Sequence, residues 1–300
     1  SGSRLTTGGT FIASELEKRL ADFKHSESAL VFNTGYMTNL GVLYGLLQTG
    51  DVVFSDELNH ASIIDGCRIS RCKVVVYKHN DMADLQRLLE TEIVTGQRFI
   101  VTDGVFSMDG DIADLPSLAV LKKQFNAFLI VDDAHGVGVI GNDGSGTASH
   151  YGLTDVIDLQ VGTLSKALAA EGGYVAGKKI LIDYLINRSR PFIFSTALAP
   201  ATLAAANAAL LLLQTQASKY LDSLRANSRL MRRLLLEGGL NVVEGITPII
   251  PVVIGEAGLT MQFADRLKSK GILVSGIRPP TVPRGESRLR ITVTAAHCEE

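Results

Sequence analysis

The feature of this sequence that most restricts its fold is a series of short apolar runs with no polar residues alternating between them. Strands covered on both faces have this composition, whereas half-exposed strands alternate. The segments between the runs are long enough for helices, so the sequence predicts an α/β fold with a mainly parallel, helix-covered sheet. The expected strands are residues 28–33, 52–55, 73–77, 98–103, 127–132, 158–162 and 173–176.

A different pattern predicts a smaller C-terminal α+β domain. Helical periodicity runs from Pro200 to the glycine pair at 238–239, with a break expected at 214–218. We therefore predict a large domain at 1–215 and a small C-terminal domain at 216–300. The elements expected after the glycine pair are strands at 249–254, 272–274 and 288–293 and a helix at 260–270.

Composition argues against several classes of protein. The 29 basic and 31 acidic residues give a formal charge of −2 without long blocks of either sign, so no nucleic-acid partner is expected. Cys67, Cys72 and Cys298 are too few for a disulfide framework and lack zinc-ligand spacing, so we expect free thiols and no metal. The most apolar stretch, 197–213, is interrupted by proline and polar residues, and no signal peptide is recognisable. We expect a cytoplasmic protein that does not span a membrane.

Polar residues directly follow the expected strand at 127–132, where open α/β sheets bind ligands. Asp132 and His135 lie three residues apart at this strand end. A carboxylate there can hold the protonated nitrogen of a heterocycle and keep the ring electron-withdrawing. The alternative is an aspartate that caps a loop and a histidine with a structural role.

A lysine among small and apolar neighbours follows the expected strand at 158–162. Burial of a lysine can lower the pKa of its ammonium by roughly 3–5 units, which supplies a neutral amine for Schiff-base formation or proton abstraction. Lys166 is therefore a candidate for such chemistry, and Thr163 nearby is a candidate phosphate ligand. The alternative is a surface lysine at the start of a helix.

Three further positions fit the same kind of site. Ser107 follows the expected strand at 98–103 and can hydrogen-bond a ring hydroxyl. The turn at Gly35 opens a helix whose first backbone amides form a phosphate seat, although alone it is only a helix start. His60 has small neighbours and can lay its imidazole on an aromatic cofactor, although a single histidine is more often structural.

One competing motif occurs at 136–141, where the sequence matches the G-x-G-x-x-G pattern of dinucleotide-binding proteins. The glycine-rich segment 142–146 follows it in place of a helix, so no helix N-terminus is available for a pyrophosphate. The sequence therefore does not favour a nicotinamide site.

Together these motifs resemble those of the α-oxoamine synthases, a family of fold-type I enzymes that use pyridoxal 5′-phosphate (PLP). The resemblance covers almost the whole chain, and within the family residues 277–283 and 294–297 are most similar to the biotin-pathway member. The family usually has a further N-terminal segment and a last helix, so we expect a chain truncated at both ends. The other matching motifs lie at 33–36, 58–62, 105–110, 132–135, 162–166, 191–196 and 288–291.

The resemblance implies a role for each matching residue. Lys166 would form a Schiff base with PLP, and Asp132 would hold the pyridinium nitrogen. His135 would contact the ring hydroxyl, and His60 would stack on the ring. The other residues implied to seat or contact the cofactor are Gly35, Tyr36, Met37, Ser107 and Thr163, with Ser195 and Thr196 reaching its phosphate across the interface of a homodimer.

The resemblance also implies a reaction. Arg278 would bind the carboxylate of L-alanine, and Thr281 would lie beside a pimeloyl-thioester carried by coenzyme A or an acyl carrier protein. Lys166 would remove the Cα proton, and the two substrates would condense with loss of carbon dioxide while His60 donates to the developing oxyanion. The alternatives are a glycine C-acetyltransferase or another α-oxoamine synthase and, outside enzymes, a catalytically silent module of the same fold.

Overall fold

The computed structural model describes residues 2–298, which fall into two compact units. The first unit contains Ser1–Val105 and Ala113–Ala217, and the second contains Phe106–Ile112 and Ser218–Glu300. The boundary after Ala217 lies close to the predicted one at 215. The assignment of 106–112 to the second unit was not predicted, because nothing in that short segment marks it as separate from its neighbours.

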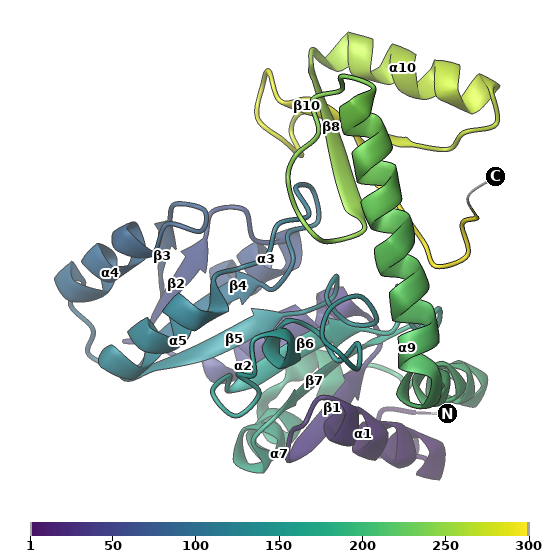
Figure 1. Cartoon of the computed structure of the whole chain (residues 1–300). Coiled ribbons are helices and arrows are strands. Elements are labelled where there is room, and N and C mark those ends of the chain that lie inside the picture. The colour runs from purple at the N-terminus through teal and green to yellow at the C-terminus, as the bar shows by residue number, and fades with distance from the viewer. Residues whose placement is uncertain (1, 299–300) are drawn as a thin grey trace. The chain divides into compact units, whose positions relative to one another are not determined.

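The first unit is built on a seven-stranded sheet with the order β1-β7-β6-β5-β4-β2-β3 (Figure 1). β7 is antiparallel to both of its neighbours, and the other neighbouring pairs are parallel, so the predicted mainly parallel sheet is confirmed. The strands are β1 (Ser28–Phe32), β2 (Val52–Asp56), β3 (Lys73–Tyr77), β4 (Arg98–Asp103), β5 (Ala127–Asp132), β6 (Leu159–Thr163) and β7 (Gly173–Gly177).

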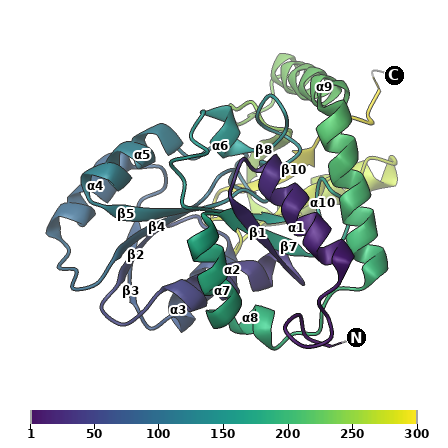
Figure 2. The same cartoon turned by 90° about the horizontal axis from the view of Figure 1, so that it is seen from below.

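Helices cover both faces of this sheet (Figure 2). Several begin at a side chain that accepts a backbone hydrogen bond, such as Thr10, Asp81 and Asp114, which gives an acceptor to an amide that the helix itself leaves unpaired. The helices are α1 (Phe11–Phe23), α2 (Gly35–Leu46), α3 (Ala61–Ile69), α4 (Met82–Thr91), α5 (Leu115–Gln124), α6 (Thr147–His150), α7 (Lys179–Arg188), α8 (Arg190–Ile193) and the first part of α9 (Pro200–Glu237).

Each face of the sheet has its own hydrophobic core. In β1, Leu30 and Phe32 pack with side chains of α2, α3, α7 and α8, whereas Ala29 and Val31 pack with α1 and the start of α9. Successive side chains of a strand point to opposite faces, so a strand in this position needs apolar residues throughout. This requirement explains the uninterrupted apolar runs in the sequence.

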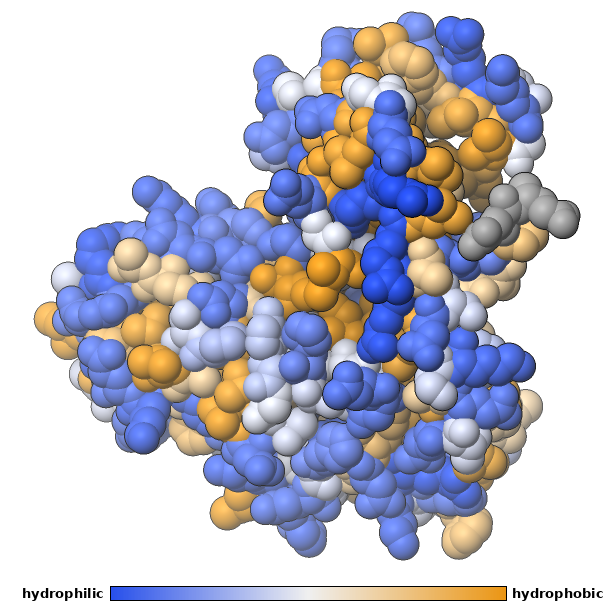
Figure 3. Space-filling model, in the orientation of Figure 1, coloured by the Kyte–Doolittle hydropathy of each residue, from blue (hydrophilic) through white to orange (hydrophobic). Residues whose placement is uncertain are grey.

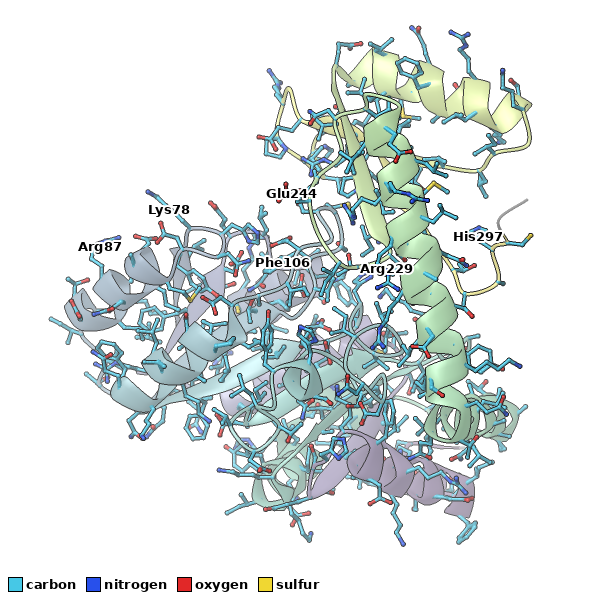
Figure 4. All side chains as sticks on the ribbon, viewed as in Figure 1. Lys78, Arg87, Phe106, Arg229, Glu244 and His297 are labelled. Carbon is cyan, nitrogen blue, oxygen red and sulfur yellow. The ribbon has the colours of Figure 1, made fainter. Side chains whose placement is uncertain are left out.

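Polar surfaces separate these cores from solvent. Helix α4 buries Leu85 and Leu89, and the region of α4 and α5 at the left of Figure 3 is mainly hydrophilic. Lys78 and Arg87 lie at the β3 and α4 end of the first unit (Figure 4). Charged residues beside an edge strand such as β3 discourage pairing with other strands.

The second unit contains a three-stranded antiparallel sheet with the order β8-β10-β9. Its core includes Ile250, Val252 and Leu289. The elements of this unit are the rest of α9, β8 (Ile249–Gly255), α10 (Ala257–Ser269), β9 (Ser275–Ile277) and β10 (Ser287–Thr292).

Two predictions about the elements in this part of the chain had different outcomes. The break predicted at 214–218 is confirmed, since Gln216 interrupts α9 with a φ of −134° and a ψ of 22°. The strand predicted at 272–274 is wrong, because the amide of Ile272 closes the C-terminal turn of α10 on the carbonyl of Leu267. Leu273 is 87% exposed, and the strand begins only at Ser275.

The apolar stretch at 197–213 enters the first part of α9, where Leu203, Ala206 and Leu210 are buried. Among the described residues, no helix has the length and apolar character needed to traverse a bilayer. The three cysteines are free thiols.

Candidate active site

The ends of three neighbouring parallel strands define the candidate site. Asp103 closes β4, Asp132 closes β5 and Thr163 closes β6. Asp103 is the register partner of Asp132, and Asp132 is the register partner of Val161. Lys166 follows β6 by a short turn. Because parallel strands end at one edge of a sheet, Asp132 and Lys166 arise from adjacent positions on the same edge.

The carboxylate of Asp132 is buried and held at both oxygens. Its Oδ1 accepts a hydrogen bond of 3.0 Å from the backbone amide of Ala134, and its Oδ2 accepts one of 2.6 Å from Nδ2 of Asn39. Asn39 lies on α2 and is buried. Sequence reasoning did not identify Asn39 as a site residue, although a polar side chain in a mainly apolar helix was an available signal.

The next residue, Asp133, makes a buried ion pair. Its Oδ2 lies 2.7 Å from Nζ of Lys24, and both side chains are at most 1% exposed. The same carboxylate accepts hydrogen bonds from the backbone amide and the hydroxyl of Thr147. Nζ of Lys24 also donates to the carbonyl of Ser145. These contacts tie the loop after β5 to the end of α1.

His60 is the N-cap of α3, and its ring is held by Ser62. Nδ1 of His60 lies 2.7 Å from Oγ of Ser62 and also accepts from the backbone amide of Ser62 at 3.3 Å. Nδ2 of Asn39 donates to the same hydroxyl at 2.8 Å. The imidazole is therefore linked through Ser62 and Asn39 to Asp132.

Asp103 is a second site residue that sequence reasoning missed. Its Oδ2 accepts from the backbone amide of His60 at 3.1 Å, and its own amide donates to Oδ1 of Asn59. Burial raises the pKa of the Asp103 carboxyl well above its usual range, and the neighbouring Asp132 raises it further. The available signal was its position, because Asp103 ends an apolar run as Asp132 does.

The N-terminus of α2 lies beside the end of β6. Oγ1 of Thr34 caps the helix by accepting from the amide of Met37 at 3.0 Å. A Cβ atom on Gly35 would lie 3.3 Å from Oγ1 of Thr163, and one on Gly173 would lie 2.6 Å from the backbone nitrogen of Gly35. These glycines allow the close approach that brings the first helical amides and the Thr163 hydroxyl together. The helical amides are suited to an anion, and beside them the Thr163 hydroxyl donates to the carbonyl of Gly172 at 3.0 Å.

Tyr36 and Met37, in the first turn of α2, are both exposed. The hydroxyl of Tyr36 donates to the carboxylate of Asp65, and this hydrogen bond raises the pKa of the phenol. The predicted residues Gly35, Tyr36 and Met37 therefore share one helix start, which faces solvent in the single chain.

Lys166 and His135 lie in turns after β6 and β5. The Lys166 side chain is exposed in the single chain. The reason is local, because its turn is closed by backbone hydrogen bonds from Ala169 to Lys166 and from Ala170 to Leu164, which leaves the lysine side chain outside the core. Ala169 holds a positive φ of 47°, a conformation that costs free energy for a residue with a Cβ atom.

The predicted pair Ser195 and Thr196 lies near the end of β1. The carbonyl of Thr196 accepts a hydrogen bond of 2.7 Å from Nδ2 of Asn33, and Thr196 forms an isolated β-bridge with Ser3. Ser195 is half-buried and Thr196 is exposed. Their predicted contact with the phosphate in a partner subunit stays a prediction.

Ser107 belongs to the second unit. Its carbonyl accepts a hydrogen bond from Nε of Arg290, and the neighbouring Asp109 forms an ion pair with Arg288. Two motifs that are far apart in the sequence, 105–110 and 288–291, therefore meet inside this unit. The role predicted for the Ser107 hydroxyl stays a prediction.

The two predicted substrate residues also belong to the second unit. Arg278 and Thr281 are both exposed, and the amide of Thr281 donates to the carbonyl of Arg278 at 3.1 Å. Figure 4 shows two other charged residues of this unit, Arg229 on α9 and Glu244 in the loop that follows α9. The substrate roles of Arg278 and Thr281 stay predictions.

The glycine-rich string at 136–141 forms turns in the structure. The next helix, α6, begins only at Thr147 and is four residues long. In the described part of the chain, no helix therefore starts directly after the string, as a dinucleotide-binding motif requires.

The fold is that of the fold-type I PLP-dependent enzymes, and the fold class predicted from the sequence is confirmed by solved structures. The chain superposes on a serine palmitoyltransferase structure with a PLP internal aldimine with a TM-score of 0.96 and 32% identity, covering 100% of this chain and 75% of that one. A Francisella tularensis 8-amino-7-oxononanoate synthase gives a TM-score of 0.82 and 31% identity, covering 96% and 83% of the two chains.

The chain belongs to the aminotransferase class I and II family, which matches residues 1–300. It is 51% identical to an 8-amino-7-oxononanoate synthase of Lysinibacillus sphaericus, over 100% of this chain and 77% of the relative. It is 52% identical to the same synthase of Geobacter sulfurreducens, over 99% of this chain and 76% of the relative. These relatives confirm the resemblance that was identified from the motifs.

Proposed function

We propose that this chain is a PLP-dependent acyltransferase that condenses L-alanine with a pimeloyl-thioester to give 8-amino-7-oxononanoate, a step of biotin biosynthesis. The observation that carries the proposal is the pair of adjacent strand ends that Asp132 closes and Lys166 follows. Relatives of about half identity that are named for this synthase support the same activity.

The residues of the first unit fit PLP. The start of α2 at Gly35, with the Thr163 hydroxyl beside it, suits the phosphate. Asp132 suits the pyridinium nitrogen, because it is a buried carboxylate with further acceptor capacity. His60 and His135 follow β2 and β5 and suit the ring face and the ring hydroxyl. When bound, PLP supplies an electron sink for the bonds to the amino-acid Cα.

The chain's own residues would supply orientation and proton transfer. Asn39 and the amide of Ala134 hold the Asp132 carboxylate in one orientation, so its charge stays aligned with the nitrogen that it binds. The Lys166 amine would hold PLP in the resting protein. Once alanine has taken its place, this amine would remove the Cα proton and later return one.

The proposed reaction takes up one proton from solvent and needs no other reactant. A carbon–carbon bond forms between the alanine Cα and the thioester carbonyl carbon, and the thiol leaves with a proton. The former alanine carboxylate departs as carbon dioxide, and a proton replaces it at Cα. Arg278 would orient that carboxylate with a two-pronged set of donors, and Thr281 would contact the acyl chain.

We propose a homodimer as the working unit and coenzyme A or an acyl carrier protein as the acyl carrier. Ser195 and Thr196 would then reach the phosphate of the partner subunit, as the family resemblance implies. Size-exclusion chromatography with light scattering tests the dimer. A monomer that binds PLP at full occupancy would contradict the shared phosphate site.

Borohydride trapping tests the site directly. Reduction of the PLP-loaded protein followed by peptide mass spectrometry should place a pyridoxyl group on Lys166. A Lys166→Ala variant should lose the label and turnover but keep its circular dichroism spectrum. Lys179→Ala, which removes an exposed lysine paired with Asp183 on α7, is the matched control and should keep both. A label elsewhere, or substantial condensation by Lys166→Ala, would refute the assignment.

Substrate choice is tested separately with a panel of amino acids and acyl-thioesters. Alanine with pimeloyl-thioester should give the highest kcat/KM, on coenzyme A or on an acyl carrier protein. A preference for glycine with acetyl-coenzyme A would identify a glycine C-acetyltransferase instead. Lys166 and Asp132 would keep their roles under either outcome.

A further inference from the structure

A continuous chain of hydrogen bonds runs from Asp132 to the ring of His60. Oδ2 of Asp132 is 2.6 Å from Nδ2 of Asn39, Nδ2 is 2.8 Å from Oγ of Ser62, and Oγ is 2.7 Å from Nδ1 of His60. Asp132, Asn39 and Ser62 are buried, so water does not offer them alternative partners. All four residues belong to the first unit.

Counting donors fixes the direction of this chain from Asn39 to Asp132 and to Ser62. The amide nitrogen of Asn39 carries two hydrogens and no lone pair for accepting, so it donates both to the Asp132 carboxylate and to the Ser62 hydroxyl. A flipped Asn39 amide would place its oxygen against the carboxylate, which is repulsive. Ser62 accepts from Asn39 and can donate its own hydrogen to Nδ1 of His60, which fits an unprotonated Nδ1.

A second contact leads to the same protonation state. The backbone amide of Ser62 can only donate, and it lies 3.3 Å from Nδ1 of His60. A hydrogen on Nδ1 would therefore face the amide hydrogen of Ser62. The neutral imidazole avoids this conflict by carrying its hydrogen on Nε2.

We infer that Asn39 and Ser62 are positioning residues that hold His60 as the Nε2–H tautomer. The imidazole then presents a hydrogen-bond donor through Nε2 and has no free lone pair with which to act as a base. Under the proposed function, on which this catalytic consequence rests, His60 stabilises negative charge on the thioester oxygen and leaves proton abstraction to Lys166.

The chain contains a histidine suited as an internal reference. Nδ1 of His79 lies 3.0 Å from Oδ1 of Asp56, and a carboxylate accepts, so Nδ1 of His79 carries a hydrogen. His60 and His79 should therefore give opposite signatures at Nδ1 in one spectrum.

Long-range proton–nitrogen NMR of protein labelled with 15N-histidine reads these states directly. A His60→Gln variant and a His79→Gln variant assign the signals. Nδ1 of His60 should resonate as an unprotonated nitrogen and Nε2 as a protonated one, both with and without PLP. The reverse pattern for His60 would overturn the inference. Because the apoprotein suffices, failure to trap PLP on Lys166 would refute the proposed function and leave this result standing.

The role of Ser62 is tested with Ser62→Ala, which breaks the chain and leaves only the long contact from the backbone amide. The His60 signals should shift toward a mixture of tautomers. In the holoenzyme, kcat for condensation should fall about tenfold while KM for alanine stays within about twofold, since a donor to developing charge acts in the transition state. Unchanged His60 signals would overturn the positioning role, and an unchanged kcat despite shifted signals would overturn its catalytic consequence.

Ser70→Ala is the matched control. Ser70 lies at the C-terminal end of the same helix, where its hydroxyl donates to the carbonyl of Cys67, so the substitution removes the same atom without touching His60. Its spectrum and kcat should match those of the wild type. A loss of kcat in Ser70→Ala equal to that in Ser62→Ala would attribute the effect to α3 as a whole and contradict the inference.

Discussion

Replacing Lys24 with methionine tests how strongly the loop after β5 depends on the buried ion pair. The side chains have similar lengths, so Lys24→Met removes the charge with little change in volume. The Asp133 carboxylate would lose the ammonium 2.7 Å away in a site where both side chains are at most 1% exposed. It would remain buried without a counter-ion.

The expected cost follows from the contacts that remain. Removing one partner of a buried ion pair costs about 3–5 kcal/mol, because the other charge stays desolvated. Asp133 keeps three hydrogen bonds from the amide and hydroxyl of Thr147, at 3.2, 3.1 and 2.9 Å, so we expect the lower end of that range, about 3 kcal/mol. For a unit of this size, such a loss lowers Tm by about 6–12 °C.

Urea and thermal unfolding followed by circular dichroism measure this loss for the transition of the first unit. Lys179→Met removes an exposed lysine of the same type and should change the free energy of unfolding by at most about 1 kcal/mol. The double variant Lys24→Met with Asp133→Asn should be more stable than Lys24→Met alone. If Lys24→Met costs less than about 1 kcal/mol, or if the double variant recovers nothing, the pair does not stabilise this loop as argued.

Three further predictions concern other contacts. Burial is the main cause of the raised pKa of Asp103, so the folded state binds its proton more tightly than the unfolded state, and this stabilisation is lost as pH rises above 3.8. With rising pH, the urea midpoint of Asp103→Asn should therefore fall less than that of the wild type. Equal slopes in the two proteins would contradict this prediction. Gly173→Ala should destabilise the first unit in thermal unfolding, because its Cβ would lie 2.6 Å from the backbone of Gly35, and unchanged stability would contradict this close approach. Arg288→Met should cost the second unit about 1.5 kcal/mol in urea unfolding, because the partly exposed Asp109 loses a charged hydrogen-bond donor, and a cost within about 0.5 kcal/mol would show that the pair is dispensable.

The strands of the large sheet were predictable because burial on two faces leaves a simple pattern. All seven strands expected in this sheet agree with the structure within one residue at each end, as at 28–33 against Ser28–Phe32. The strand expected at 272–274 does not form, because the apolar residues there follow the end of helix α10. Ile272 closes a helix end, and a pattern of hydrophobicity does not distinguish these uses.

Site residues could be predicted from the sequence where they directly follow a strand of the large sheet. Asp132 and Lys166 follow apolar runs, and runs that form neighbouring parallel strands end at one edge. Asn39 and Ser62 were missed because their importance comes from contacts between helices α2 and α3, which the polar character of Asn39 in an apolar helix does not reveal by itself. The exposure of Lys166 in the single chain could not be predicted, since small neighbours in the sequence do not determine how a turn faces solvent.

The assignment of 106–112 to the second unit means that this unit cannot be cut out as one continuous peptide. A fragment beginning at Ser218 would retain Arg288 but lack Asp109, and Thr247 would have no Gly110 carbonyl to receive its hydroxyl hydrogen. The second unit is complete only when two separate segments of the chain, Phe106–Ile112 and Ser218–Glu300, are both present and packed together. Gene fusions or exchanges at residue 217 should therefore transfer an unfinished module, however natural that breakpoint looks in the sequence.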